Sequence, residues 1–305
     1  MLFRSSFIRP SSLRSNRKAV LQLLTSALTA RHLNHELHES TLPLVALESS
    51  AIALLPTLTA YETAHSLAFR TGLGSSLYAS SDSPIGILDV RELWNAALKR
   101  EIGIVGTGLS QEELENLVKH VLAEALDQDV LEGKSEETGK QEKTKVFGGE
   151  KRIALDLHKL DAANGEVKPT FLVAYAIESA PKPEHLVLPY LLGTEKKSLK
   201  RSEGSPLSVA AGVVGEGTKA QAYLASYSDA SLVCVEVTAE GSKRLSEGAK
   251  EVVKAVKGLK VDKESLKRAV GQAKLEVALK WDTAEGVRET LATSVSHAFL
   301  ERKDV

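Results

Sequence analysis

Apolar residues near the start of the chain repeat at the spacing of a helix. The repeat runs from residue 19 to residue 69 and begins with Leu21, Leu24 and Leu28. Because residues three and four apart share one face of an α-helix, the pattern predicts helices over 19–69, punctuated by Pro43 and Pro56. A glycine-containing polar run from Gly72 to Pro84 then predicts a loop.

A second helix signal stands further along the first half. Ser110 and Glu113 have capping-box spacing, so each side chain can bond the backbone N–H of the other. An apolar stripe follows, made of Leu114, Leu117, Val118, Val121, Leu122 and Ala125. The apolar run 102–105 before this helix predicts a short strand, with a turn between the two elements.

The chain changes character over residues 127–145. This stretch is almost wholly polar and mixes both charge signs. Such a segment buries too little apolar surface to order itself, which is typical of an exposed linker. We therefore predict an N-terminal half over 19–126 and a C-terminal half over 146–305.

Strand signals open the C-terminal half. Four strands are predicted, over Arg152–Leu160, Thr170–Glu178, Ala220–Tyr227 and Ser231–Ala239. The last two flank the turn residues Ser228–Ala230, which indicates an antiparallel hairpin. In the second hairpin strand Val233, Val235 and Val237 alternate onto one face.

Two amphipathic helices follow these strands. The apolar stripe of one consists of Leu245, Ala249, Val252, Val253 and Val256. The stripe of the other consists of Leu266, Ala269, Val270, Ala273 and Val277, with Asp262 placed to cap the helix. Strands gathered first and helices afterwards indicate an α+β fold, in which helices pack on a mainly antiparallel sheet.

The N-terminus has a one-sided charge. No acidic residue precedes Glu36, while arginines and a lysine are interleaved with serines and apolar residues. A basic, serine-rich and acid-free start is typical of a mitochondrial transit peptide, and we assign residues 1–18 to such a leader. A basic tail, or an artefact of where the gene model starts, would have the same composition.

Composition excludes several classes of function. The 305 residues carry a formal charge of −1, which gives no global attraction to nucleic acid or to an anionic membrane. Cys234 is the single cysteine, so an intrachain disulfide is excluded, and its apolar surroundings predict a buried side chain. The most apolar short stretch, Leu186–Leu192, has the length of a strand or core segment and is far shorter than a membrane span.

A histidine-rich segment suggests a metal site but has the wrong spacing. The residues concerned are His32, His35, Glu36, His38 and Glu39. A zincin helix needs H-E-x-x-H, and Glu39 stands where the second histidine of that motif would be. The inverted motif H-x-x-E-H fails as well, because the order here is H-x-x-H-E. A solvated helix start explains the segment better.

Two glycine-rich segments resemble nucleotide-binding loops only in part. Gly106 and Gly108 begin a G-x-G-x-x-G pattern, but Gln111 occupies the third glycine position. In Gly212–Lys219, Thr218 stands where a P-loop has its lysine. No G-x-S-x-G sequence is present. We therefore assign no catalytic residue, no cofactor-binding residue and no metal ligand.

Ordered features along the chain resemble a known family. They run from Arg31–Glu48 through His65-Ser-Leu-Ala-Phe-Arg-Thr-Gly-Leu-Gly74 to Gly103–Leu114. A later series begins at Phe147-Gly-Gly-Glu150 and includes Ala222-Tyr-Leu-Ala-Ser-Tyr-Ser-Asp-Ala230. Over residues 20–305 this order resembles the inverted-zincin metallopeptidase family, which includes the mitochondrial processing peptidase and the core proteins of ubiquinol–cytochrome c reductase. The second series is most similar to a fungal core protein.

The resemblance implies what the chain shares with the family and what it lacks. Active members carry H-x-x-E-H early in the first half, and this chain is expected to begin after that position. The first half is thus expected to lack its opening elements, and the second to stop within its closing ones. After Leu192-Gly193 a charged segment stands where the non-catalytic peptidase subunit has a glycine-rich loop.

The function implied by the resemblance is structural. We expect a non-catalytic core subunit on the matrix side of the mitochondrial inner membrane, peripheral to the lipid and without a cofactor. The resemblance implies core protein 1, cytochrome b and cytochrome c1 of respiratory complex III as partners. A presequence-binding subunit of the processing peptidase is the alternative, which the charged segment disfavours. An independent zinc peptidase would require ligands that the sequence does not provide.

Overall fold

The structure of the chain is a computed structural model. It describes residues 14–28, 34–79, 85–98, 104–122, 144–154, 168–194 and 204–301. Contacts divide the chain into two compact units, of which unit 1 contains Glu48–Tyr78 and Lys143–Leu279. Unit 2 contains Phe3–Leu47, Ala79–Glu142 and Lys280–Val305. Of the linker predicted at 127–145, only residues 144 and 145 are among the described residues. The division into two halves therefore stays a prediction.

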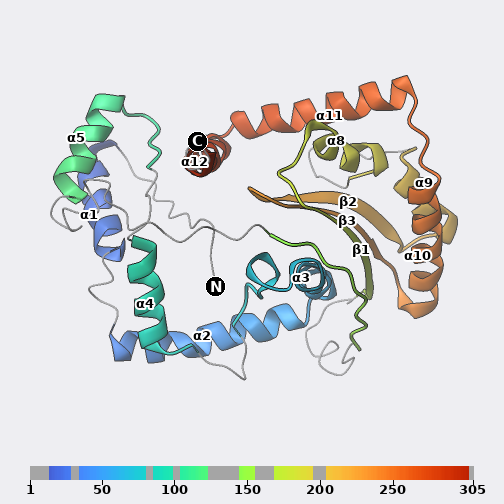
Figure 1. The fold of residues 1–305 in the computed structure, drawn as a ribbon, viewed down its shortest axis with the longest axis horizontal. Helices are drawn as coiled ribbons and strands as arrows, with labels where there is room; N and C mark the ends of the chain where they lie inside the picture. Colours follow the sequence, from blue (N-terminus) through green and yellow to red (C-terminus); the bar gives the residue numbers. More distant parts are fainter. Residues whose placement is uncertain are drawn as a thin grey trace. The chain divides into compact units, whose positions relative to one another are not determined.

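Unit 1 is built on a three-stranded antiparallel sheet. Its strands are β1 (Thr170–Ile177), β2 (Lys219–Ser226) and β3 (Ser231–Thr238), in the order β1-β3-β2. The predicted hairpin is confirmed, because Ala222 pairs with Val235 across β2 and β3. The α+β fold class is confirmed as well, since helices cover this sheet on both faces (Figure 1).

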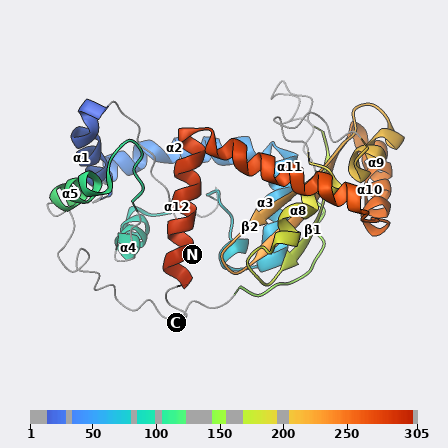
Figure 2. The same cartoon turned by 90° about the horizontal axis from the view of Figure 1, so that it is seen from above.

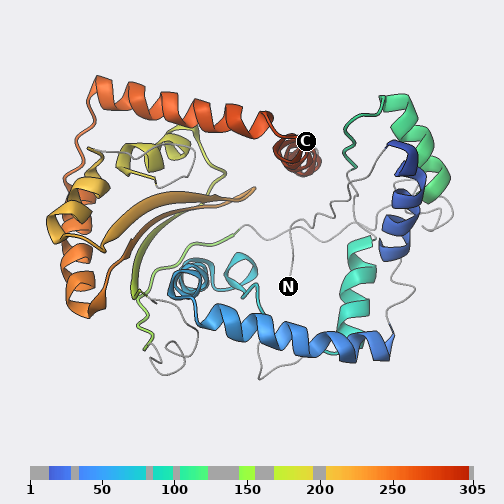
Figure 3. The same cartoon turned by 180° about the vertical axis from the view of Figure 1, so that it is seen from behind.

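Alternation along β3 divides the core of unit 1 into two layers. Val235 and Val237 face helices α8 (Pro183–Leu192), α9 (Pro206–Val214) and α10 (Gly241–Lys257). Leu232 and Cys234 face the opposite side, which α3 (Pro56–Phe69) covers. Seen from behind in Figure 3, α3 and α8 again lie on opposite sides of the strands. Both faces of the central strand are therefore buried.

Helices α8 and α9 both begin with a proline at their first position. Pro183 and Pro206 suit this position because the first backbone N–H groups of a helix have no intrahelical acceptor. The Ser205 side chain accepts a hydrogen bond from the Ser208 N–H at 3.3 Å and caps α9. Leu186–Leu192, whose length suited a strand or core segment, lies within α8, and Pro189 and Leu192 are its buried residues.

Helix α10 packs side by side with α9 (Figure 2). Its buried residues are Gly248 and Val252, of which Val252 belongs to the predicted apolar stripe; the other members of the stripe are partly buried. Gly248 lets the helix approach the sheet, since a Cβ there would stand 3.1 Å from a methyl carbon of Val237. Burying a side chain such as Leu207, which is fully enclosed in this layer, stabilises the fold by about 1.5–3 kcal/mol.

The helices predicted over 19–69 are confirmed, but the interruption expected at Pro43 is wrong, because Pro43 lies inside a continuous helix. They are α1 (Arg17–Leu28), α2 (His35–Ala53) and α3, preceded by a short 3-10 turn at Arg14–Asn16. Pro56 begins α3, and Arg70 ends it with a φ of 57°. Among the described residues no single helix is long and apolar enough to cross a membrane; α2 and α3 meet the length and composition criteria only together, with a bend of 94° between them.

The sequence pattern predicts only some of the helices of unit 2. Helix α5 (Gln111–Leu122) has its predicted capping box: the Glu113 N–H donates to the Ser110 Oγ, and the Ser110 N–H donates to Glu113. Helix α4 (Ile87–Leu98) was not predicted, nor was α12 (Ala284–Glu301). The strand predicted at 102–105 is wrong in its described part, because Ile104 and Val105 belong to no strand.

Helix α11 (Lys263–Trp281) confirms the second predicted C-terminal helix. Asp262 caps it as expected, accepting the Ser265 N–H at 2.7 Å. The Tyr190 hydroxyl of α8 donates a hydrogen bond to the Glu276 carboxylate of α11, which ties the two helices together. The strand predicted over Arg152–Leu160 is absent from the described residues 152–154, and its remainder lies outside them.

Candidate functional site

Polar side chains are concentrated on the face of the sheet that α3 covers. Tyr61, His65 and Phe69 recur every four residues along α3, so one face of the helix presents them to the sheet. His65 is only 6% exposed, which is unusual for a titratable side chain. These residues and their partners on the sheet form the buried polar cluster of unit 1. The partners are Gln221 and Tyr223 of β2, Tyr227 directly after β2, and Cys234 and Glu236 of β3.

His65 is held at both ring nitrogens. Its Nδ1 lies 2.9 Å from the carbonyl oxygen of Tyr61, and its Nε2 lies 2.7 Å from the hydroxyl of Tyr227. Because a carbonyl can only accept, Nδ1 carries the hydrogen and Nε2 accepts from Tyr227. Burial lowers the pKa of His65 below its usual 6.5, against the raising effects of the Tyr61 carbonyl and of Glu62. The imidazole is therefore neutral at physiological pH.

Aromatic contacts surround this histidine. The Tyr61 ring lies 4.2 Å from the imidazole, and the Tyr227 ring stands nearly perpendicular to it at 5.8 Å. Phe69 contacts Tyr227 edge-on at 6.2 Å. Edge-on pairs at these separations place a positive ring edge against a negative ring face, which is the favoured aromatic geometry. The cluster thus combines directional hydrogen bonds with apolar packing.

Glu236 is a buried carboxyl on the same face of β3. It is 6% exposed and accepts hydrogen bonds from the Gln221 side-chain amide at 3.2 Å and the Tyr223 hydroxyl at 3.3 Å. Burial raises the pKa of Glu236 above its usual 4.5, and the two hydrogen bonds offset this in part. Burial also raises the pKa of Tyr223, and the neighbouring Cys234 and Glu236 add to the effect.

Cys234 is fully buried between these groups, as the sequence predicted. Burial raises the pKa of its thiol to about 12. A thiol is a nucleophile only as the thiolate, so Cys234 acts here as a small apolar side chain. The groups of the buried polar cluster bond one another, and those on α3 and after β2 hold the helix on the sheet. That joins a helix of the predicted N-terminal half to strands of the predicted C-terminal half.

A short segment is held against the same layer by its backbone. The N–H of Thr144 donates to Asp229 at 3.0 Å, and the N–H of Phe147 donates to the carbonyl of Ala68 at 2.8 Å. The guanidinium of Arg70 lies 4.3 Å above the Phe147 ring, a cation–π contact. The Phe147-Gly-Gly-Glu150 motif therefore begins at the end of α3.

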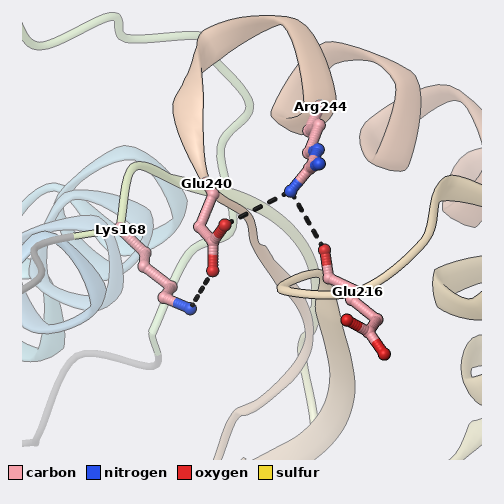
Figure 4. Close-up of polar contacts among 4 residues, drawn as sticks. All are labelled: Lys168, Glu216, Glu240 and Arg244. Carbon is pink, nitrogen blue, oxygen red and sulfur yellow. Dashed lines mark hydrogen bonds and ion pairs between the residues drawn. The ribbon is translucent and has the colours of Figure 1, made fainter.

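An exposed ionic network ties the start of β1 to the start of α10 (Figure 4). The Glu240 carboxylate lies 3.0 Å from Lys168 Nζ and 3.2 Å from Arg244 Nη1. The same Arg244 nitrogen donates to the carbonyl oxygen of Glu216 at 3.1 Å. Lys168 is the main reason that the pKa of Glu240 lies below its usual value. The network therefore joins the residues before β1, before β2 and before α10 at one end of the sheet.

The residues considered as ligands in the sequence do not come together in the structure. His35 and Glu39 are exposed on α2, 3.9 Å apart, and His38 bonds the carbonyl oxygen of Ile85 at 3.0 Å. His32 lies outside the described residues. No group of three or more His, Cys, Asp or Glu side chains within the described part of the chain has the geometry of a metal site. The Gly106 segment precedes α5 as an irregular turn.

Sequence reasoning missed the residues of the buried polar cluster. His65 was noted only as the first residue of a family motif, and Tyr227 only as part of a hairpin. Glu236 had a visible signal, because it is the one charge within Ser231–Thr238, a strand otherwise suited to complete burial. No local pattern pairs His65 with Tyr227, since 162 residues separate them.

Curated proteins with similar sequences share one name. The cytochrome b-c1 complex subunit 2 of Cryptococcus neoformans is 37% identical over 278 residues, covering 90% of this chain and 61% of its own length. This chain is a homologue of that subunit. The subunits 2 of Yarrowia lipolytica and Neurospora crassa are each 31% identical, over 80% and 88% of this chain. The expected resemblance to a fungal core protein is thereby confirmed.

The homology covers only part of each relative. The chain spans between 54% and 61% of the length of these three subunits. No family model matches the chain. Among solved structures, an M16-like peptidase from Alicyclobacillus acidocaldarius aligns with a TM-score of 0.48 at 14% identity, over 92% of this chain and 65% of that one.

Proposed function

We propose that the chain serves as a non-catalytic core subunit 2 of mitochondrial respiratory complex III. The observation that carries the proposal is the 37% identity to cytochrome b-c1 complex subunit 2 over nine-tenths of the chain. The proposed location is the matrix side of the inner membrane, peripheral to the lipid. The proposed partners are core protein 1, cytochrome b and cytochrome c1.

The chemistry of the buried polar cluster supports a structural role. Its imidazole is neutral, its thiol is protonated, and its hydroxyls and carboxyl bond one another. A catalytic group needs contact with substrate, and these side chains lie between α3 and the sheet, bonded to one another. The cluster instead fixes the position of α3 on the sheet.

Exposed aliphatic side chains on α9 support assembly with other subunits. Val209 is 56% exposed and Val213 is 69% exposed, and their i, i+4 spacing places them on one face. Leu186 of α8 is exposed to 48%. Clustered apolar exposure favours a protein contact, because burying it removes apolar surface from water.

Separation of native complexes tests the proposal. Mitochondria are solubilised gently, their complexes are separated by size, and the peptide Ala220–Lys243 is followed by mass spectrometry. Co-migration with cytochrome b and cytochrome c1 is the expected result. Migration in a small soluble species with presequence-processing activity would overturn it and favour the processing-peptidase alternative.

A further inference from the structure

Unit 1 carries a concentrated positive charge where α10 ends and α11 begins. Residues 250–268, here called the basic corner, contain seven basic and three acidic side chains, while the whole chain has a formal charge of −1. All seven basic side chains are exposed: Lys250, Lys254, Lys257, Lys260, Lys263, Lys267 and Arg268. The corner thus departs strongly from the charge balance of the protein.

The lysines form stripes that face away from the core. On α10 they recur at i, i+4 and i+7 (Lys250, Lys254 and Lys257), opposite the buried Val252. On α11 they recur at i, i+4 and i+11, in the series Lys263, Lys267 and Lys274. Residues at these spacings share one helix face, so each helix presents a row of charges.

Two of the three acidic residues of the corner are engaged locally, and the third, Glu264, is exposed in the first turn of α11. Glu251 pairs with Lys254 at 3.6 Å. Asp262 accepts a hydrogen bond from the backbone N–H of Ser265, and this bond lowers the pKa of Asp262. Its negative charge therefore lies at the N-terminus of α11, which the helix dipole favours. Four lysines around the turn therefore have no acidic counterpart in the contacts of the described residues: Lys257, Lys260, Lys263 and Lys267.

Two aliphatic side chains project among these lysines. Val261 in the turn is 53% exposed, and Leu266 in the first turn of α11 is 43% exposed. A purely acidic peptide would satisfy the lysines but would leave these aliphatic side chains exposed to water. A bilayer binds both kinds of side chain. Its anionic headgroups attract the lysines, and the aliphatic side chains enter the boundary between headgroups and acyl chains.

We propose that the basic corner docks on an anionic lipid bilayer. The lysines supply the attraction to headgroup phosphates, and Val261 with Leu266 supplies the contact with the acyl region. This contact goes beyond the proposed core-subunit role and is measurable on the isolated chain, so its failure leaves the complex III assignment to its own test. Each lysine near an anionic surface raises the partition coefficient roughly fivefold.

Vesicle sedimentation tests the electrostatic part. The full chain is mixed with phosphatidylcholine vesicles that contain or lack phosphatidylglycerol. We expect binding only to the anionic vesicles, weakened by added salt, and at least about thirtyfold weaker for the corner variant K257E/K260E/K263E/K267E. The matched variant K145E/K151E/K219E/K243E has the same net charge but changes exposed lysines elsewhere, and it should bind substantially better than the corner variant.

Three outcomes would overturn the proposal. Wild-type protein that stays in solution with anionic vesicles would do so, and so would equal losses for the corner variant and the matched variant. Binding to soluble polyglutamate without binding to anionic vesicles would also overturn it, in favour of an acidic protein partner. Unfolding curves of both variants are recorded first, so that a folding defect is not read as a binding defect.

A fluorescent label tests the apolar part. Cys234, the one native cysteine, is fully buried, so an environment-sensitive dye on V261C reports the corner alone. We expect a blue shift on addition of anionic vesicles, and no shift for the same dye on K151C. A dye at V261C that keeps its aqueous spectrum while the protein sediments with vesicles would contradict insertion at the corner.

Discussion

The Nε2 atom of His65 accepts a hydrogen bond from the hydroxyl of Tyr227 at 2.7 Å, although 162 residues separate the two in the chain. His65 belongs to α3, and Tyr227 follows directly after β2. The bond therefore joins a helix and a sheet that the sequence assigns to different halves. It is buried, so its loss cannot be replaced freely by water.

Removal of this bond should weaken unit 1. In Y227F the Nε2 atom of His65 loses its donor within an apolar layer, and we expect the free energy of unfolding to fall by about 1–3 kcal/mol. Chemical denaturation followed by circular dichroism measures the change. Y175F is the matched control, because Tyr175 is 48% exposed on β1. Equal effects of the two substitutions would refute a role for the His65 bond.

Acidification should destabilise the same layer. Because the pKa of His65 lies below its usual 6.5 in the folded protein, the unfolded chain takes up a proton at a higher pH than the folded chain does. The contribution of neutral His65 to the free energy of unfolding is complete above pH 6.5, and it is lost as the pH falls from 6.5 through the lower pKa of the folded protein. H65Q should flatten this part of the stability profile. H35Q, which changes an exposed histidine of α2, should leave it in place.

The secondary structure of unit 1 was accessible from the sequence where the signal is local. The alternation in Ser231–Thr238 and the turn before it predict the hairpin, and the spacing after Gly241 predicts α10. Leu186–Leu192 had no usable period, because apolar residues continue from its buried positions, Pro189 and Leu192, to the exposed Leu186.

The buried polar cluster could not be predicted, because its contacts are long-range. His65 meets Tyr227 only once α3 covers the even-numbered positions of β3, and no periodicity encodes that choice of face. Glu236 could have been singled out as a charge in a buried strand, but its partners Gln221 and Tyr223 depend on the register of the hairpin. Strand register is a property of the folded sheet.

Neutralisation of Glu236 should stabilise the protein at high pH. Its pKa is raised above 4.5 in the folded state, so the fold favours the protonated carboxyl, and stability falls as the pH rises through the folded pKa. E236Q removes the ionisable group and with it this loss, while its amide oxygen keeps one of the two acceptor oxygens that Gln221 and Tyr223 bond separately. His65 is present in both proteins, so its own pH dependence cancels when they are compared. The unfolding temperature of E236Q relative to that of the wild type should therefore be higher at pH 8 than at pH 5.

The control for this prediction is E184Q, which removes the same charge from an exposed position of α8. It should change the two unfolding temperatures equally. A difference in unfolding temperature between E236Q and the wild type that is the same at both pH values would contradict a raised pKa at Glu236.

Gly193 should tolerate no side chain. It ends α8 with a φ of 130°, and its carbonyl oxygen accepts the N–H of Ala222 at the outer edge of β2. A Cβ at this position would stand 2.5 Å from the Ser205 Oγ, the atom that caps α9. G193A therefore combines backbone strain with a clash at a helix cap, and we expect a loss of about 1–3 kcal/mol or more in the free energy of unfolding.

Gly212 provides the opposite case one helix further on. It lies within α9, and a Cβ there has no atom within 4 Å. Since alanine loses less backbone freedom than glycine in a helix, G212A should raise the free energy of unfolding by roughly 0.5–1 kcal/mol. Relative to the wild type, the urea concentration at the midpoint of unfolding should thus fall for G193A and rise for G212A. If both glycines proved equally tolerant of alanine, Gly193 would not be fixing the end of α8 against Ser205 and β2.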